Sequence, residues 1–392
     1  MANIVFITGG SGARGIAREM ARRKCHTAHI INVSDSGGST RQLRLLFEKL
    51  PAIGDLRSRL IDLADRESPA YEASTALLKY RLPVDKEPAE LEREWQSILK
   101  GDHRLVQAID NEAFTRILLK ELNVCETERR IVEHEQRVLF DLAKASIGNL
   151  FLAGAYFDYG QSLETAIFLY HQLANVRGDV IPATTESLTL AAKLEDGTNL
   201  VEQHVISHEK TSPSPIKELF YLDWAYPCLD APIIPRLHKD AIAAIANADM
   251  IVFSMGSFYT SILSTLYIRG MAEAVRSNTK AVKVFTANPT EDRETVGMTT
   301  GMMAGKVIDT LRRFDSSPST VDGDYLQRVF VGEWAGILAP GLHPISQDLA
   351  GLDLEKTSSL LKPVYDKDDL AKVVAVHYQA KTLADELMRL VA

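Results

Sequence analysis

The sequence predicts an α/β fold: a doubly wound, mostly parallel, Rossmann-like sheet with a helical insertion. Short apolar runs are followed by small polar loops and then by helix-like stretches, first at the N-terminus and again near residue 250. Between these units, residues 66–145 are charged and helix-like, with prolines as breaks. We therefore expect residues 1–392 to form a single domain with its insertion at 66–145. The ligand should lie at the carboxyl ends of the strands.

The composition is that of a globular protein with a large core. Of 392 residues, 46% are hydrophobic and 24% are charged, and the net charge is -8. Neither Lys nor Arg dominates any long face, so we expect no nucleic-acid or anionic-membrane partner. The three cysteines are widely spaced without a C-x-x-C pair, which argues against a disulfide framework and a thiolate zinc site.

The first apolar run, Ile4–Ile7, is too short for the core of a signal peptide and has no basic segment before it. No apolar window approaches the roughly 18 residues of a membrane span. We expect a cytoplasmic protein without a membrane partner. A homo-oligomer is allowed.

The N-terminal unit reads as strand, loop and helix. Asn3–Thr8 forms a buried strand, a glycine-rich loop at 9–15 follows, and Ile16–Arg23 is helix-like. Glycines allow close approach of the backbone, and a helix N-terminus offers free N–H groups to a phosphate. The loop matches G-x-G-x-x-G, and Asp35 lies about 20 residues after it, beyond a second strand at Ala28–Val33.

This fingerprint also raises a nicotinamide oxidoreductase as an alternative. A short-chain dehydrogenase would need a Tyr four residues before a Lys, and no Tyr in the chain has that spacing. A second glycine and hydroxyl loop also follows Asp35, and ribose recognition does not require it. An NAD(P)-dependent oxidoreductase is therefore the weaker alternative.

Two further turns favour a phosphorylated ligand. The first reads Asp35-Ser36-Gly37-Gly38-Ser39, and the second reads Gly54-Asp55-Leu56-Arg57. Backbone N–H groups, hydroxyls and a guanidinium suit phosphate oxygens, whereas carboxylates suit a ribose hydroxyl, a hard cation or a proton.

These motifs resemble the CofD-like family, which includes 2-phospho-L-lactate transferase and regulators of the gluconeogenesis-factor type. The resemblance continues in order through Tyr80-Arg81, Gly148-Asn149-Leu150, Val180-Ile181-Pro182-Ala183-Thr184 and Gly256-Ser257-Phe258-Tyr259-Thr260-Ser261-Ile262. It implies a single CofD-like α/β domain. The family pattern often has a His shortly before Gly148, where this chain has Ala145 and Ser146.

The middle of the chain carries fewer signals. The insertion at 66–145 is a lid, a self-association surface or a solvated helical bulge. Leu150–Tyr170 is predicted as one buried helix and Val180–Thr185 as a strand, while Leu188–Leu194 is helix-like or strand-like. Val201–Ile206 alternates like an exposed strand. On that reading, His204 and His208 would not converge on a metal.

The second strand–loop–helix unit begins after a helix at Lys239–Asn247. Asp249–Ser254 is a core strand, and the loop after it opens a helix at Ile262–Ile268. Its hydroxyls suit oxyanions, and Tyr259 either stacks on a ring of the ligand or packs at the sheet edge. A strand at Ala281–Ala287 then ends at Asn288, Val329–Val331 is strand-like, and Asp366–Leu390 reads as a closing amphipathic helix.

The resemblance implies a transferase that moves a phospho-group of the 2-phospho-L-lactate type from a nucleotide diphosphate donor to an alcohol such as a deazaflavin, with Mg²⁺. The alternative is a non-catalytic regulator that binds a nucleotide sugar. Asp55, Asp35 and Arg57 are the candidate catalytic residues, and Asp55 and Asp35 are the candidate metal ligands. The candidate ligand-binding residues are Gly9, Gly10, Ser11, Gly12, Gly37, Gly38, Ser39, Asn149, Thr184, Gly256, Ser257, Tyr259, Thr260, Ser261 and Asn288.

Overall fold

A computed structural model describes residues 1–10, 12–65, 67–208, 214–317, 319–333, 345–349, 352, 354–365 and 373–391. The predicted ligand residue Ser11 lies outside these described ranges.

The central sheet has eight strands, and every neighbouring pair is parallel except the one at the C-terminal edge. Across the sheet they are β11 (Val373–Tyr378), β10 (Glu355–Tyr365), β9 (Arg328–Glu333), β8 (Val282–Thr286), β7 (Met250–Phe253), β1 (Ala2–Thr8), β2 (Cys25–Ile31) and β3 (Asp179–Pro182). From β3 to β9 this is the doubly wound order of a dinucleotide-binding fold. The strand order reverses between β1 and β7, where such folds bind their ligands. The predicted fold class is confirmed.

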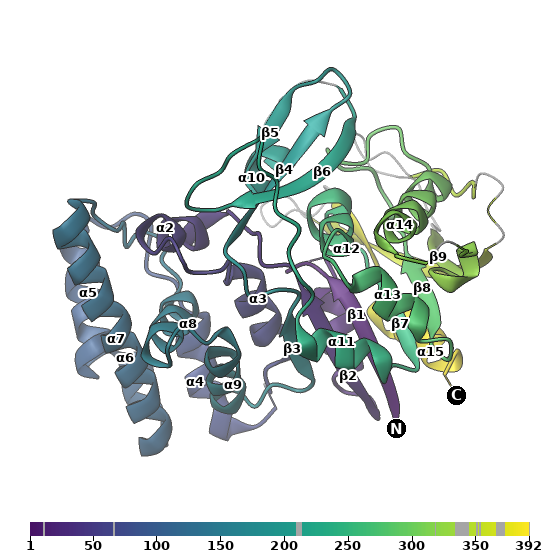
Figure 1. The fold of residues 1–392 in the computed structure, drawn as a ribbon. Coiled ribbons are helices and arrows are strands. Elements are labelled where there is room, and N and C mark those ends of the chain that lie inside the picture. Colours follow the sequence, from purple (N-terminus) through teal and green to yellow (C-terminus); the bar gives the residue numbers. More distant parts are fainter. Residues whose placement is uncertain are drawn as a thin grey trace.

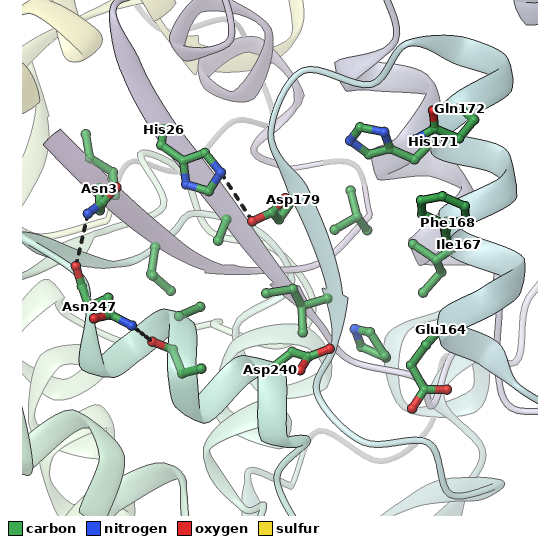
Figure 2. Close-up of a pocket in the computed structure, with 18 residues that line it drawn as sticks. Asn3, His26, Glu164, Ile167, Phe168, His171, Gln172, Asp179, Asp240 and Asn247 are labelled. Carbon is green, nitrogen blue, oxygen red and sulfur yellow. Dashed lines mark hydrogen bonds and ion pairs between the residues drawn. The ribbon is translucent and has the colours of Figure 1, made fainter. Parts of the chain in front are cut away.

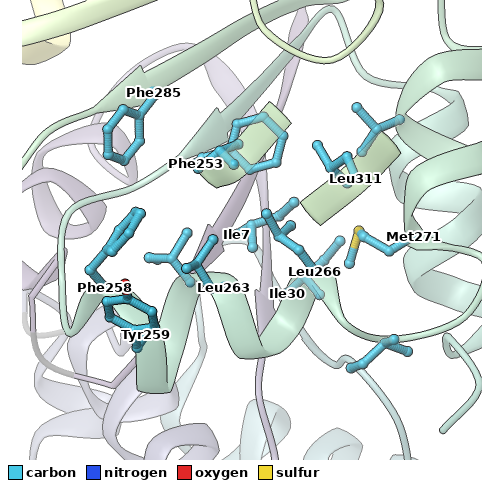
Figure 3. Close-up of a cluster of buried hydrophobic side chains, with 14 of the residues drawn as sticks. Ile7, Ile30, Phe253, Phe258, Tyr259, Leu263, Leu266, Met271, Phe285 and Leu311 are labelled. Carbon is cyan, nitrogen blue, oxygen red and sulfur yellow. The ribbon is translucent and has the colours of Figure 1, made fainter. Parts of the chain in front are cut away.

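Both faces of the sheet are buried, as a parallel sheet requires. In β1, Ile4 and Phe6 face a cluster built with α1 (Arg14–Met20) and α15 (Ala380–Arg389). Val5 and Ile7 point to the opposite face, into a second large apolar cluster. Figure 3 shows Ile7 in that cluster, beside side chains from the segments that follow β7.

A helical layer forms a second core beyond the β2–β3 side of the sheet (Figure 1). It consists of α2 (Gly38–Leu46), α3 (Gly54–Leu63), α4 (Pro69–Lys79), α5 (Pro88–Lys100), α6 (Arg104–Gln107), α7 (Glu112–Gln136), α8 (Ile147–Asp158) and α9 (Leu163–Ala174). Most of the described residues 67–145 are helical, as the sequence predicts, but Leu118, Leu122 and Cys125 of α7 are fully buried in this core. The insertion is therefore not a loosely attached, solvated bulge.

The predicted helix Leu150–Tyr170 is two helices. The helical conformation is interrupted between α8 and α9, where Gly160 and Gln161 both adopt positive φ angles, 65° and 64°. The α9 helix then begins at Leu163, with the Ser162 hydroxyl accepting a hydrogen bond from the Thr165 N–H.

A small antiparallel sheet lies above the end of the main sheet that carries the glycine loop (Figure 1). It contains β5 (Asn199–Val201), β4 (Leu188–Leu194) and β6 (Ile216–Asp223). The predicted strand Val201–Ile206 is wrong: the strand ends at Val201 and α10 (Gln203–His208) follows. A helix of six residues is too short to show a helical period, and its apolar residues imitate the alternation of a strand.

The remaining elements complete the second half of the fold. They are α11 (Lys239–Ala246), η1 (Phe258–Leu263, a π-helix), α12 (Ser264–Leu266), α13 (Met271–Ser277), α14 (Thr300–Phe314) and η2 (Asp322–Asp324). The predicted closing helix Asp366–Leu390 is only partly correct. Residues 366–372 lie outside the described ranges, Val373–Tyr378 forms β11, and α15 covers the last part. Among the described residues, no helix is both long and apolar enough to span a bilayer.

Candidate functional site

A pocket of about 180 Å³ lies at the switch point between β1 and β7. Loops from the carboxyl ends of β1, β2 and β7 meet there with the first turn of α3 and with α10. The lining residues are Gly9, Gly10, Gly12, Asp35, Gly37, Asp55, Gln203, His204, Ser207, Gly256, Ser257 and Ser261. All of these except the three from α10 were predicted as site residues from sequence.

Glycines allow these loops to touch. A Cβ on Gly10 would overlap Asp55 Oδ1, and a Cβ on Gly9 would overlap the Ser261 hydroxyl. A Cβ on Gly12 would lie 2.6 Å from Gly256 Cα. The glycine loop after β1 is therefore wedged between a carboxylate and the loop after β7, with no room for side chains.

Two partly buried carboxylates share the pocket. Asp35 accepts a hydrogen bond from the Gly37 N–H at 2.9 Å, and Asp55 accepts one from the Gly10 N–H. Burial raises the pKa of Asp35. Burial, with a smaller contribution from the nearby charge of Asp35, raises the pKa of Asp55 to about 7. At neutral pH the pair therefore holds a proton or attracts a cation.

Buried arginines surround the carboxylates from behind. Arg59 donates to the Gly9 carbonyl at 2.9 Å and to the Thr8 hydroxyl at 3.3 Å. Arg44 donates to the carbonyl of Leu188 at 2.6 Å, and burial lowers its pKa to about 9. These guanidiniums hold the loops and make the local potential favourable for an anion.

The third predicted catalytic residue, Arg57, does not line the pocket. Its Nε donates to Asn149 Oδ1 at 3.2 Å, and Asn149 Nδ2 donates to the Ser39 hydroxyl at 3.0 Å. Arg57, Asn149 and Ser39 therefore lie behind the Asp35 loop. Gly38 begins α2 with a φ of 49° and also lies outside the lining.

The predicted residues of the loop after β7 have separate roles. Gly256 and Ser257 line the pocket, and Asn288 fixes Gly256 by accepting from its N–H at 3.1 Å and donating to its carbonyl at 2.8 Å. Tyr259 is 5% exposed and packs in the apolar cluster that contains Val5 and Ile7, rather than facing the pocket. Thr184 is buried outside the lining, where its hydroxyl bonds Glu186.

Glu294 was not among the predicted site residues. Its carboxylate accepts hydrogen bonds from the N–H groups of Tyr259 and Thr260, at 2.8 and 3.1 Å, and from the hydroxyls of Thr260 and Ser207, both at 2.7 Å. Burial raises its pKa. The first N–H groups of η1 thus already bind an internal carboxylate, and Thr260 is occupied by it.

The α10 residues Gln203, His204 and Ser207 were also not predicted as pocket residues. The sequence does contain a signal, since His204 and His208 are four residues apart and a helix would place them on one face. The strand interpretation of 201–206 hid it.

The carboxylate pair fits a magnesium ion that shares its ligands with a substrate. No group of three or more His, Cys, Asp or Glu side chains suitable for a metal occurs among the described residues. Mg²⁺ commonly binds through one or two carboxylates together with substrate phosphates and water. Asp35 and Asp55 meet that requirement, whereas an all-protein metal cage does not form in the described part of the chain.

A larger pocket, of about 670 Å³, lies at the amino ends of β1, β2 and β3, between α9 and α11 (Figure 2). His26 Nε2 lies 3.2 Å from a carboxylate oxygen of Asp179 on its wall, and Glu164 and Asp240 also line it. Its lining contains no Lys or Arg and none of the predicted site residues. The larger pocket therefore lacks the residues that the sequence predicts for the site, although its volume is greater.

Comparison with known proteins shows the family of the chain. Residues 4–331 match the sequence model of the family described as 2-phospho-L-lactate transferase CofD. The chain belongs to the CofD family. The matched range includes every predicted site residue.

Relatives of this CofD-family chain carry different names. A protein of Aquifex aeolicus named as a gluconeogenesis factor is 29% identical over 318 residues, which is 80% of this chain and 74% of that protein. An uncharacterized protein of Saccharomyces cerevisiae is 26% identical and is covered to 83%, against 79% of this chain. The fold is shared with a UPF0052 family member from Bacillus halodurans, with a TM-score of 0.69, 21% identity, and coverage of 99% of this chain and 100% of that one.

Proposed function

We propose that the chain is a CofD-type transferase that moves a phospho-group, of the 2-phospho-L-lactate type, from a nucleotide diphosphate donor to an alcohol acceptor such as a deazaflavin. The observation that carries this proposal is the partly buried Asp35–Asp55 pair beside the glycine loops at the switch point. A carboxylate whose pKa is raised to about 7 suits proton transfer at neutral pH.

The proposed chemistry forms one bond and breaks one. The acceptor oxygen bonds to the transferred phosphorus, the bond from that phosphorus to the nucleoside monophosphate oxygen breaks, and the hydroxyl proton passes to Asp55. N–H groups of the loops after β1 and β2 and the hydroxyls of Ser257 and Ser261 bind phosphate oxygens. Mg²⁺, held by Asp35 and Asp55, would neutralise diphosphate charge. Arg57 acts through Asn149 and by its positive charge.

A second candidate function is a non-catalytic regulator that binds a nucleotide sugar in the same pocket. The gluconeogenesis-factor name of the Aquifex aeolicus relative favours it. The histidine that the family often has shortly before Gly148 is also absent, since Ala145 and Ser146 occupy that region. Both functions share phosphate binding by the glycine loops and differ in whether Asp55 accepts a proton.

A thermal-shift screen separates the candidates. The purified chain is tested with UDP-sugars, GDP, GTP, a deazaflavin and NAD(P), each with and without Mg²⁺. A response to GDP together with the deazaflavin supports transfer, and a response to UDP-sugars alone supports the regulator. A response to NAD(P) only would refute both.

Asp55→Asn then tests the chemistry. Turnover, measured as release of nucleoside monophosphate, should be abolished while the nucleotide still binds. Asp179→Asn, in the larger pocket, is the matched control and should leave turnover unchanged. Equal loss of binding and turnover in Asp55→Asn would show that Asp55 does not act as the proton acceptor.

A further inference from the structure

The pocket is smaller than the ligand it is proposed to hold. Its volume is about 180 Å³, whereas sites for ligands of drug or cofactor size measure about 300–1,000 Å³. A nucleotide diphosphate joined to a further group belongs in that larger range. One side of the lining, made by Gln203, His204 and Ser207, comes from the single short helix α10.

Two sets of contacts fasten α10 at opposite sides of the pocket. On the β2 side, the Ser36 hydroxyl accepts the His204 N–H at 3.1 Å, and Arg41 forms a two-bond ion pair with Glu202, at 2.8 and 3.1 Å. On the β7 side, Ser207 bonds Glu294 at 2.7 Å and Thr260 at 3.1 Å. These contacts are polar. Between them, Ile206 of α10 is buried in the apolar cluster that contains Val5 and Ile7, and Val205 packs against that cluster.

The residue that joins β5 to α10 is strained. Glu202 has a φ of 78°, in the left-handed region that residues with a Cβ seldom adopt. Its side chain is the partner of Arg41, and its backbone N–H donates to the Leu190 carbonyl of β4 at 2.9 Å. Residues with a strained backbone cluster at active sites, ligand clamps and switch regions.

The contacts of His204 determine which atom it offers to a ligand. The Ser36 hydroxyl oxygen accepts a hydrogen bond from the backbone N–H of His204. The hydroxyl proton of Ser36 can in turn be donated to His204 Nδ1, which lies 3.1 Å away. We assign the remaining proton to Nε2 for this reason. If the ring is instead protonated, Nδ1 faces Glu202 at 3.4 Å and Nε2 again carries a proton. In both protonation states, Nε2 carries a proton that it can donate to a ligand.

We propose that α10 is a lid over the phosphate pocket, which lifts about Glu202 to admit the ligand and on closing places the His204 Nε2–H against a ligand oxyanion. This inference rests on the proposed function for the identity of the ligand. The position of α10, its fastenings and the strain at Glu202 do not depend on that identity.

Hydrogen exchange tests the lid without a ligand. Arg41→Gln and Ser207→Ala each remove one fastening, and each should raise the exchange rate of the α10 amides at least fivefold while leaving α3 unchanged. Arg312→Gln, which breaks a remote surface ion pair with Asp322, is the control and should leave α10 as it is. Unchanged exchange of α10 in both fastening variants would overturn the proposal.

Binding kinetics test the opening step. With GDP and Mg²⁺, surface plasmon resonance should show both association and dissociation accelerated at least threefold in Arg41→Gln, because opening becomes easier in either direction. Rates equal to those of the wild type would overturn the lid. If the wild type binds neither GDP nor a UDP-sugar, the proposed function fails, and the exchange experiment still decides the lid.

Two substitutions test the contact from His204. His204→Phe should weaken binding of GDP with Mg²⁺ about tenfold, and His204→Gln, which keeps a side-chain N–H donor, should stay within about threefold of the wild type. Equal affinity in all three proteins would show that the closed lid does not place His204 on the ligand.

Discussion

The chemistry of the site depends on single side chains whose directions are set by helix geometry. Asp55 and Arg57 lie two residues apart on α3, and residues at that spacing do not share a helix face. Asp55 therefore faces the pocket while Arg57 reaches Asn149 of α8. The sequence identified both residues as polar groups at a turn, but only knowledge that Gly54 starts a helix separates their roles.

The raised pKa of Asp55 predicts how stability depends on pH. Between pH 3.8 and about 7 the folded protein keeps a proton on Asp55 that the unfolded chain has lost. The folded state binds more protons there, so the free energy of unfolding falls as pH rises through this window. The difference between the two pKa values corresponds to about 4 kcal/mol, shared with the neighbouring Asp35.

We therefore expect Asp55→Asn to be more stable than the wild type by about 2–4 kcal/mol at pH 8, with most of the gain lost at pH 5. The amide oxygen can still accept the Gly10 N–H. Urea unfolding at the two pH values measures the change, with the half-exposed Asp179→Asn as the control. A gain that is the same at both pH values would contradict the charge-burial explanation.

At the scale of elements, turn chemistry was predictable from sequence and short helices were not. Glycine and hydroxyl residues after β1, β2 and β7 indicated loops that approach a ligand, and the structure brings those loops together at the switch point. The helix α10 spans only Gln203–His208 and interrupts a strand pattern. A helix of this length is fixed by its contacts with Ser36 and Glu294, which are remote in sequence.

The glycine loop offers a matched pair of substitutions. Gly10→Ala should displace Asp55, because the new Cβ would overlap its carboxylate. We expect a loss of about 1–3 kcal/mol of stability and at least a tenfold loss of GDP affinity. Gly15 lies within α1, and a Cβ added there would lie at an ordinary 3.5 Å from Ala380 Cβ of α15. Gly15→Ala should therefore be neutral or stabilising. Thermal unfolding and titration with GDP measure both variants, and equal affinities would refute the close packing.

At the scale of the whole molecule, the sequence predicted the layers but not how the helical part joins the sheet. Helical periodicity shows that a face is buried and does not say against what. In the structure, α7 packs on α8 so closely that a Cβ on Gly154 would overlap the carbonyl of Glu121. The same α8 carries Asn149, which bonds Ser39 beside the pocket. The helical layer is thus packed continuously, through α8, onto the residues that support the pocket.

Leu122→Ala tests that unity. Leu122 of α7 is fully buried in the second core. Its truncation should lower the free energy of unfolding by about 2–5 kcal/mol. Ile131→Ala on the same helix, where the side chain is 46% exposed, should cost less than about 1 kcal/mol. Because α8 links α7 to the pocket, we expect calorimetry of Leu122→Ala to show one transition at a lower temperature, with GDP binding lost in that transition. A separate early transition that leaves GDP binding intact would show that the helical layer unfolds independently of the site.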